Sequence, residues 1–156
     1  MSHLTSIKTV VKDVAALKQA CSDLGLTFLE GKKTFAWYGR FMNDWSEERS
    51  AVAQGYDPAK FGQCEHAIGV PGSTYEIGVV ANPAGDGLVL QFDEFGPGQR
   101  IIAKTGDGCG LLVQAYAVRV AQKAMDGLRT RGFRPVGVTG QVGVPGQPVV
   151  LTYQRG

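Results

Sequence analysis

Hydrophobic residues between positions 110 and 133 recur every three or four positions, as they do on one side of an amphipathic helix. The apolar side comprises Val113, Tyr116, Ala117, Val120, Ala121, Ala124, Met125 and Leu128. The polar side comprises Arg119, Gln122, Lys123, Asp126, Arg129 and Thr130. Because three apolar positions are alanines, we expect this helix of about six turns to lie close against a sheet.

The N-terminal pattern predicts a strand, a helix and a strand. Residues 4–11 are rich in β-formers, and Asp13 suits a helix N-cap. The apolar residues that follow at helical spacing are Val14, Leu17, Cys21 and Leu24. Gly25 is suited to end this helix in a left-handed cap, before a strand over residues 26–30. A third strand is predicted over residues 34–38.

The middle of the chain predicts one hairpin between two irregular segments. Residues 76–81 and 87–92 flank a turn, and the second of them alternates apolar and polar positions. Before the hairpin, residues 39–66 form an excursion with little periodicity, in which two short helices are plausible. After it, the glycine-rich residues 96–110 predict a mobile loop.

The C-terminal residues predict a second hairpin. Gly132 is suited to cap the long helix, and strands are predicted over residues 135–142 and 149–153. Pro145 and Gly146 are typical of the turn between them. The whole pattern indicates one α+β domain over residues 1–156: a largely antiparallel, twisted sheet of six to seven strands with two principal helices on one face.

Composition favours an ordinary globular protein. The 156 residues are 44% hydrophobic and 19% charged, and 22 glycines indicate many turns. No apolar run is long enough for a membrane span, and the opening residues lack a secretion-signal layout. We expect a cytoplasmic protein, or a stromal one if the chain is plastid-encoded. Cys21, Cys64 and Cys109 are odd in number and widely spaced, which favours reduced thiols.

Charge is distributed unevenly along the chain. Residues 44–94 hold nine acids and two bases, although the net charge of the whole chain is +2. The sequence pI is about 8.5, below the value above ~9 that is usual for nucleic-acid-binding domains. A nucleic-acid partner is therefore not expected.

Cys64, His66 and Cys109 are the candidate metal ligands. Zinc takes about four thiolate, imidazole or carboxylate ligands, and Glu65, Glu76 or His3 are available to complete the set. The alternative is that Cys64 packs as a small apolar side chain while His66 makes a hydrogen bond at a strand start. A thiol nucleophile is also conceivable, because Cys64 or Cys109 could pair with His66 or His3, and Cys64 and His66 share a face if both lie on a strand.

Gly106, Gly108 and Gly110 precede the long helix and are candidates for binding an anion, together with Arg131 and Arg134. Glycines let backbone N–H groups approach a phosphate at a helix N-terminus. The known phosphate-loop patterns are missing, however, and Asp107 would repel a phosphate. The alternatives are a flexible approach to the helix and arginines that complement the helix dipole.

Four aromatic residues lie within nine positions: Trp37, Tyr38, Phe41 and Trp45. Tryptophan and tyrosine are enriched at binding hot spots, which makes this group a candidate for docking a protein partner. The alternative is that the four residues are buried as a satellite core.

Several short segments resemble one family. They are residues 1–9, 23–25, 64–68, 75–79, 114–117 and 131–133. Together they are similar to the hypothetical chloroplast reading frame thirty-five family, a domain of unknown function in plastids, cyanobacteria, other bacteria and bacteriophages. The resemblance implies no reaction, cofactor or catalytic residue. It implies an accessory or adaptor role, with an AAA-type ATPase or a small companion protein as partner.

Two functions follow from the sequence. The first is a non-catalytic binding or adaptor protein that works through the aromatic excursion and can self-associate. The second is a small-ligand or phosphate-binding protein or enzyme centred on the glycine-rich loop and the Cys64–His66 region, with zinc as its possible metal.

Overall fold

The chain combines helices with antiparallel strands, which confirms the α+β prediction. The computed structural model describes residues 4–39, 56–129, 131–140 and 149–155. The elements in order are β1 (Leu4–Ser6), α1 (Val14–Asp23), β2 (Thr27–Leu29), η1 (Pro58–Lys60), β3 (His66–Gly69), β4 (Glu76–Ala81), β5 (Leu88–Asp93), α2 (Gly98–Thr105), η2 (Asp107–Cys109), α3 (Gly110–Arg129), β6 (Phe133–Thr139) and β7 (Val150–Arg155).

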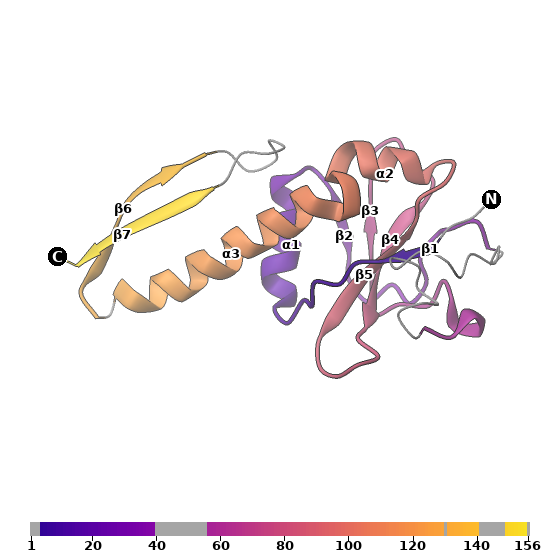
Figure 1. Ribbon diagram of the computed structural model, residues 1–156, viewed down its shortest axis with the longest axis horizontal. Helices are drawn as coiled ribbons and strands as arrows, with labels where there is room; N and C mark the ends of the chain where they lie inside the picture. The colour runs from indigo at the N-terminus through magenta and orange to yellow at the C-terminus, as the bar shows by residue number, and fades with distance from the viewer. Residues whose placement is uncertain (1–3, 40–55, 130, 141–148, 156) are drawn as a thin grey trace.

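Within the described residues, seven strands form two sheets rather than the single sheet that was expected (Figure 1). The larger sheet has five antiparallel strands in the order β1-β5-β4-β3-β2, and β6 pairs only with β7. The predicted hairpin of β4 and β5 is confirmed, with Val79 opposite Leu90. The predicted strand over residues 34–38 is wrong, because its only ladder contact is an isolated bridge between Thr34 and Gln63.

The first helix begins and ends as its sequence predicts. The Asp13 carboxylate accepts a hydrogen bond from the Ala16 N–H at 2.9 Å, which satisfies one of the free amides of the first turn. At the other end Gly25 adopts a φ of 72°, and the Leu26 N–H donates to the Cys21 carbonyl at 2.8 Å. This left-handed cap turns the chain directly into β2.

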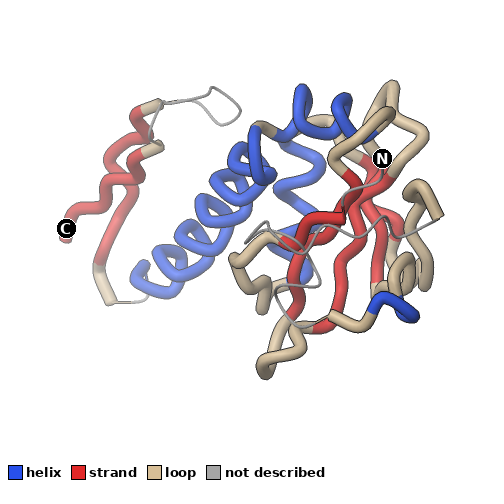
Figure 2. The backbone as a smooth tube through the Cα atoms, turned by 45° about the vertical axis from the view of Figure 1, so that its right-hand side comes forward, coloured by secondary structure: helices blue, strands red, loops and turns tan. Residues whose placement is uncertain are grey.

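The main core lies between one face of the larger sheet and the helices. Its fully buried side chains include Leu17 of α1, Leu112 of α3 and Phe92 of β5. Burying an aliphatic or aromatic side chain of this size contributes about 1.5–3 kcal/mol. The core therefore fixes α1 and the start of α3 on the sheet (Figure 2).

The buried side of α3 matches the predicted one only in part, since Tyr116 is buried and Val113 packs against the main core as predicted. Leu112, Ala115 and Tyr116 are buried, whereas Ala117 and Ala124 are exposed and Val120 is 37% exposed. The first turns of α3 are apolar on every side, so periodicity alone did not determine which side would meet the core. Ala117 and Ala124 lie roughly 80–100° around the helix from Tyr116, whereas Val120 lies only about 40° from it, one turn further along the helix.

Three polar contacts join α3 to α1, two of them from side chains that were assigned to the solvent side. Arg119 Nε donates to an Asp23 carboxylate oxygen at 2.8 Å, and Lys123 Nζ lies 2.7 Å from Asp13. The Tyr116 hydroxyl accepts from the backbone N–H groups of Lys12 and Asp13 at 3.1 and 3.2 Å. These contacts set the direction in which α3 leaves the sheet.

The second half of α3 and the hairpin of β6 and β7 form a projection, here called the C-terminal arm (residues 117–140 and 149–155, as far as they are described). Figure 1 shows α3 running away from the five-stranded sheet and the hairpin turning back from its far end. The hairpin contacts mainly α3. Gly132, with a φ of 88°, makes the reversal possible and confirms the predicted cap.

Two glycine substitutions test the fold in opposite directions. A Cβ on Gly78 of β4 would overlap the Phe35 ring, whereas one on Gly127 of α3 would meet nothing within 4 Å. We expect Gly78→Ala to lower the free energy of unfolding by about 1–3 kcal/mol. We expect Gly127→Ala to raise it by about 0.5–1 kcal/mol, because alanine favours a helix. Urea denaturation of both variants measures the difference, and equal effects would contradict the packing of Phe35.

Tyr116→Phe tests the contact between α3 and α1. The substitution keeps the buried ring but removes the acceptor of two part-buried backbone N–H groups. We expect the free energy of unfolding to fall by about 1–2 kcal/mol. Tyr38→Phe is the matched control, since Tyr38 is 50% exposed, and it should be nearly neutral. If both variants unfold like the parent protein, the hydroxyl does not stabilise the start of α1.

Candidate functional site

A cavity of about 690 Å³ opens on the face of the larger sheet that lies opposite the main core. This volume is within the range of small-molecule sites. Among the described residues its lining comprises Lys33, Thr34, Tyr56, Asp57, Lys60, Phe61, Gln63, Cys64, Glu65, Val80, Ala81, Pro83 and Gln91. The lining comes from the segment after β2, the η1 region, the approach to β3 and the outer surfaces of β4 and β5.

A second, smaller core supports one side of the cavity. It contains the buried residues Leu4, Phe35, Cys64 and Ala67. Gly78 of β4 has no side chain, and the Phe35 ring occupies the space where a Cβ would lie. Half-buried side chains that pack against this core include Tyr56, Phe61 and Val80, all of which also line the cavity.

Strand alternation places Gln91 at the floor of the cavity. Leu90 and Phe92 belong to the main core, so Gln91 between them points to the opposite face. It is 2% exposed and lies opposite Ser6 of β1 in the sheet register. Its side-chain amide interacts with the Tyr56 hydroxyl. The Tyr56 hydroxyl is near Ser6 and Gln91, and burial raises the pKa of this phenol, which keeps it protonated at neutral pH.

Charges of both signs surround the cavity. Lys33 Nζ lies 3.0 Å from Glu65, and an Asp57 carboxylate oxygen accepts from the Ala59 N–H at 3.0 Å at the start of η1. Lys60 has no ion pair among the described residues. In the described part of the lining, one ammonium group without an ion pair, that of Lys60, therefore lies beside carboxylates that already have partners.

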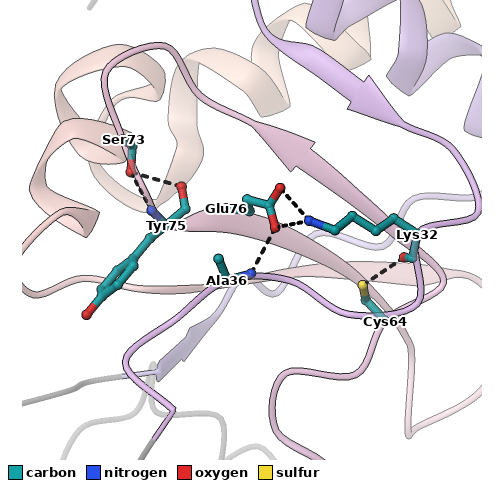
Figure 3. Close-up of polar contacts among 6 residues, drawn as sticks. All are labelled: Lys32, Ala36, Cys64, Ser73, Tyr75 and Glu76. Atoms are coloured by element: carbon teal, nitrogen blue, oxygen red, sulfur yellow. Dashed lines mark hydrogen bonds and ion pairs between the residues drawn. The ribbon is translucent and has the colours of Figure 1, made fainter.

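The Cys64 side chain is held as a thiol. Its Sγ donates to the Lys32 carbonyl at 3.1 Å, and burial raises its pKa to about 11 (Figure 3). The Lys32 ammonium group lies 2.6 Å from the Glu76 carboxylate, which also accepts from the Ala36 N–H at 2.9 Å. These contacts fix the segment between β2 and Phe35 across the sheet.

The prediction that Cys64 and His66 share a face is wrong. Glu65 donates its N–H to the Val79 carbonyl at 2.8 Å, while His66 is also the register partner of Val79. Two residues therefore lie opposite one, and the alternation shifts as in a β-bulge. His66 Nδ1 accepts from the Gly31 N–H at 2.9 Å, and its ring lies 5.2 Å from that of Phe28.

The three candidate metal ligands are not brought together. Cys109 is fully buried in the main core, on the other side of the sheet from Cys64. Burial raises the pKa of Cys109 to about 12, and the nearby Thr105 hydroxyl lies 3.7 Å from its Sγ. Within the described residues no three His, Cys, Asp or Glu side chains are grouped for a metal. His3 lies outside these residues.

The glycine-rich segment is helical rather than the loop that was predicted. It contains α2 and η2, and Gly110 begins α3. Gly106 and Gly108 adopt positive φ values of 83° and 59°, which let the chain reverse between the two helices. Arg131 and Arg134 follow the far end of this 20-residue helix, about 30 Å away, so the proposed anion-binding set is not assembled.

The aromatic residues that were predicted to act together lie in different environments. Trp37 is half-buried in the second core, where its ring packs edge-on against Phe61 at 5.9 Å. Tyr38 is 50% exposed, and its N–H donates to Asp93 at 3.3 Å. Phe41 and Trp45 lie outside the described residues. The structure therefore places Trp37 as the satellite-core alternative has it, and Tyr38 at the surface.

Sequence analysis missed Tyr56 and Gln91, which give the cavity its polar floor. A signal for Gln91 was present, since it and Asp93 interrupt the apolar positions of β5 with period two. An alternating strand normally turns its polar side to water. The polar side of β5 is covered here by residues that are distant in the sequence, so periodicity alone did not reveal the burial of Gln91.

Comparisons with protein-family models, curated proteins and solved structures found no match. No described helix is long and apolar enough to cross a membrane. The family resemblance of the short segments thus stays a prediction.

Alkylation tests the state of the thiols. Burial raises the pKa values of Cys21, Cys64 and Cys109, so all three are neutral and covered at pH 8. Since the thiolate is the nucleophile, we expect the folded protein to resist iodoacetamide at this pH. All three thiols should react in urea, which serves as the control. Rapid labelling of Cys64 in the folded protein, read by peptide mass spectrometry, would show that it is an activated thiol.

Proposed function

We propose that the protein is a non-catalytic binding protein that docks another polypeptide on its C-terminal arm. The observation that carries the proposal is the exposed apolar side of α3. Ala117, Val120 and Ala124 are exposed on a helix whose contacts with α1 are made by a different side. An apolar helix side that projects from the body of a protein is suited to packing against a second helix or groove.

The hairpin supports the same proposal. β6 and β7 pair only with each other among the described strands. A two-stranded hairpin is marginally stable by itself in water, and its outer edges carry unpaired backbone groups. The Arg155 guanidinium lies 6.0 Å from the centre of the Phe133 ring, which joins the two strands near the end of α3. A partner that covers the arm would stabilise both the hairpin and the helix.

The chemistry of the thiols also favours binding over catalysis. Cys64 and Cys109 are the nucleophiles that the sequence offered, and burial keeps both in the neutral form. His66 uses its Nδ1 as an acceptor for a backbone N–H, away from either thiol. These groups have structural roles in the turn and in the two cores.

A second copy of the chain is the first partner to test, since two identical arms can pack their apolar helix sides against each other about a twofold axis. An AAA-type ATPase or a small companion protein, which the family resemblance implies, is the next candidate. Exposed Tyr38, which the sequence assigned to partner binding, lies on the segment between β2 and η1 rather than on the arm. The alternative function, binding of a small ligand, is favoured by the cavity over β4 and β5.

Val120→Glu tests the docking surface. Because Val120 is already 37% exposed, the charge should change the free energy of unfolding of one chain by no more than about 0.5 kcal/mol. We expect it to abolish self-association measured by light scattering after gel filtration. Gln19→Glu, on the exposed side of α1, is the matched control and should leave association unchanged.

A crosslinker distinguishes a second copy from another partner. All three native cysteines are buried, so a cysteine introduced at position 120 can be labelled selectively with a photoreactive maleimide. We expect position 120 to crosslink a polypeptide in extract of the native host, and position 19 to do so weakly. If position 120 captures neither the chain itself nor any other polypeptide above the level of position 19, the proposal is wrong.

A further inference from the structure

We infer, on the basis of the proposed function, that the polypeptide that docks on the C-terminal arm is acidic. Its apolar side chains cover the exposed side of α3, and its carboxylates contact the arginines at the far end of this helix. Two features of the arm point to such a partner: an apolar ridge on α3, and a group of arginines beyond it that no acidic side chain balances.

The apolar ridge lies on the second half of α3. Ala117, Val120 and Ala124 are exposed, and half-buried Leu128 continues their spacing of i, i+3, i+7 and i+11. At about 100° per residue, these four positions lie within about 80° of one another around the helix. None of the charged residues of Gly110–Arg129 falls in this sector. A partner can therefore pack along about three turns of the helix without burying a charge.

The charge beyond the ridge has one sign. After Asp126 the sequence has no further acidic side chain, and its charged side chains are four arginines: Arg129, Arg131, Arg134 and Arg155. All four are exposed. Arg129 Nε lies 3.6 Å from Asp126, whereas the other three arginines make no ion pair among the described residues. Three guanidinium groups are thus available to carboxylates of a partner.

The hairpin register places these arginines around one end of the arm. Phe133 lies opposite Arg155, and Arg134 lies opposite Gln154. Because opposite residues share a face of the ladder and consecutive residues do not, Arg134 and Arg155 project from different faces. Arg131 lies in the turn between α3 and β6. Figure 1 shows that this end of the arm is the one farther from the five-stranded sheet, so the ridge leads outward to a positively charged end.

An acidic polypeptide fits both features, whereas a nucleic acid fits one. Phosphates would neutralise the arginines but would leave Val120 and Ala124 in water, since a nucleic acid meets a protein mainly through its charged backbone. An acidic amphipathic segment can cover the ridge and also place carboxylates on the guanidinium groups, which bind them through paired hydrogen bonds. A second copy would cover the ridge but bring the same four arginines, so the positive charge would stay unbalanced.

Selection from a random peptide library displayed on phage tests the chemistry of the partner. Peptides of about 16 residues are long enough to follow the ridge as a helix. The full chain is held on the surface through a cysteine introduced at position 19, on the exposed side of α1, which leaves the arm free. We expect the enriched peptides to carry a net negative charge and to have apolar residues three or four positions apart. A neutral or basic average charge would contradict the inference.

Fluorescence polarisation of the most enriched peptide locates its site. We expect Val120→Glu, and Arg131→Glu combined with Arg134→Glu, each to weaken binding by at least about fivefold. Added salt should weaken binding to the parent protein more than binding to the double variant. Arg100→Glu combined with Lys104→Glu, on the exposed side of α2, makes the same change in net charge and is the matched control. This control should bind like the parent protein.

The outcomes separate the acidic partner from the proposed function. If the enriched peptides need Val120 but have no acidic bias, the arm docks a polypeptide and the acidic partner is wrong. If no peptide is enriched, or binding survives the double reversal of Arg131 and Arg134, the acidic partner is also wrong, and crosslinking at position 120 still decides the proposed function. A labelled DNA duplex that binds more tightly than the peptide at equal salt, and equally well to Val120→Glu, would show a nucleic-acid site instead.

Discussion

The contact between α1 and α3 is the constraint on which the rest of the structure depends. Apolar side chains such as Leu17 and Leu112 bury both helices against the sheet. The Tyr116 hydroxyl, together with the pairs of Asp13 with Lys123 and of Asp23 with Arg119, fixes how α3 lies along α1. An apolar core excludes water without specifying a direction, whereas hydrogen bonds and ion pairs at both ends of α1 do specify one. The direction of α3 in turn decides that its second half and the hairpin project as an arm.

The two faces of the larger sheet serve different purposes. One face carries apolar residues against the helices, and the other carries Gln91, Val80 and the glycine that accommodates Phe35. Small, irregular segments cover this second face rather than a helix, so the covering is incomplete and a cavity remains. A polar side chain that would be solvated on an open sheet is thereby buried next to an apolar space. This combination is what a ligand site requires.

The two proposed surfaces lie on separate parts of the molecule and rest on unrelated observations. The arm exposes apolar side chains, whereas the cavity is enclosed by apolar walls over the polar side chains of Gln91 and Tyr56. The arm therefore predicts association that a charged substitution abolishes. The cavity predicts binding of a ligand that an apolar substitution in its lining prevents. The thiols and His66, which had suggested metal binding or catalysis, have packing and hydrogen-bonding roles among the described residues. In small proteins a buried cysteine usually behaves as an apolar side chain.

Local signals determined much of the secondary structure. Asp13 and Gly25 mark α1, alternation marks β5, and Gly132 marks the end of α3, because caps and periodicity depend only on neighbouring residues. Tertiary structure decided which residues of α3 are buried, since Leu112 and Ala115 join Tyr116 in the core while Ala117 and Ala124 are exposed, and the sequence pattern does not distinguish them. It also decided that the strands form two sheets, that a bulge separates His66 from Cys64, and that Gln91 is covered. Each of these outcomes is a contact between residues far apart in the chain, which the sequence pattern does not contain.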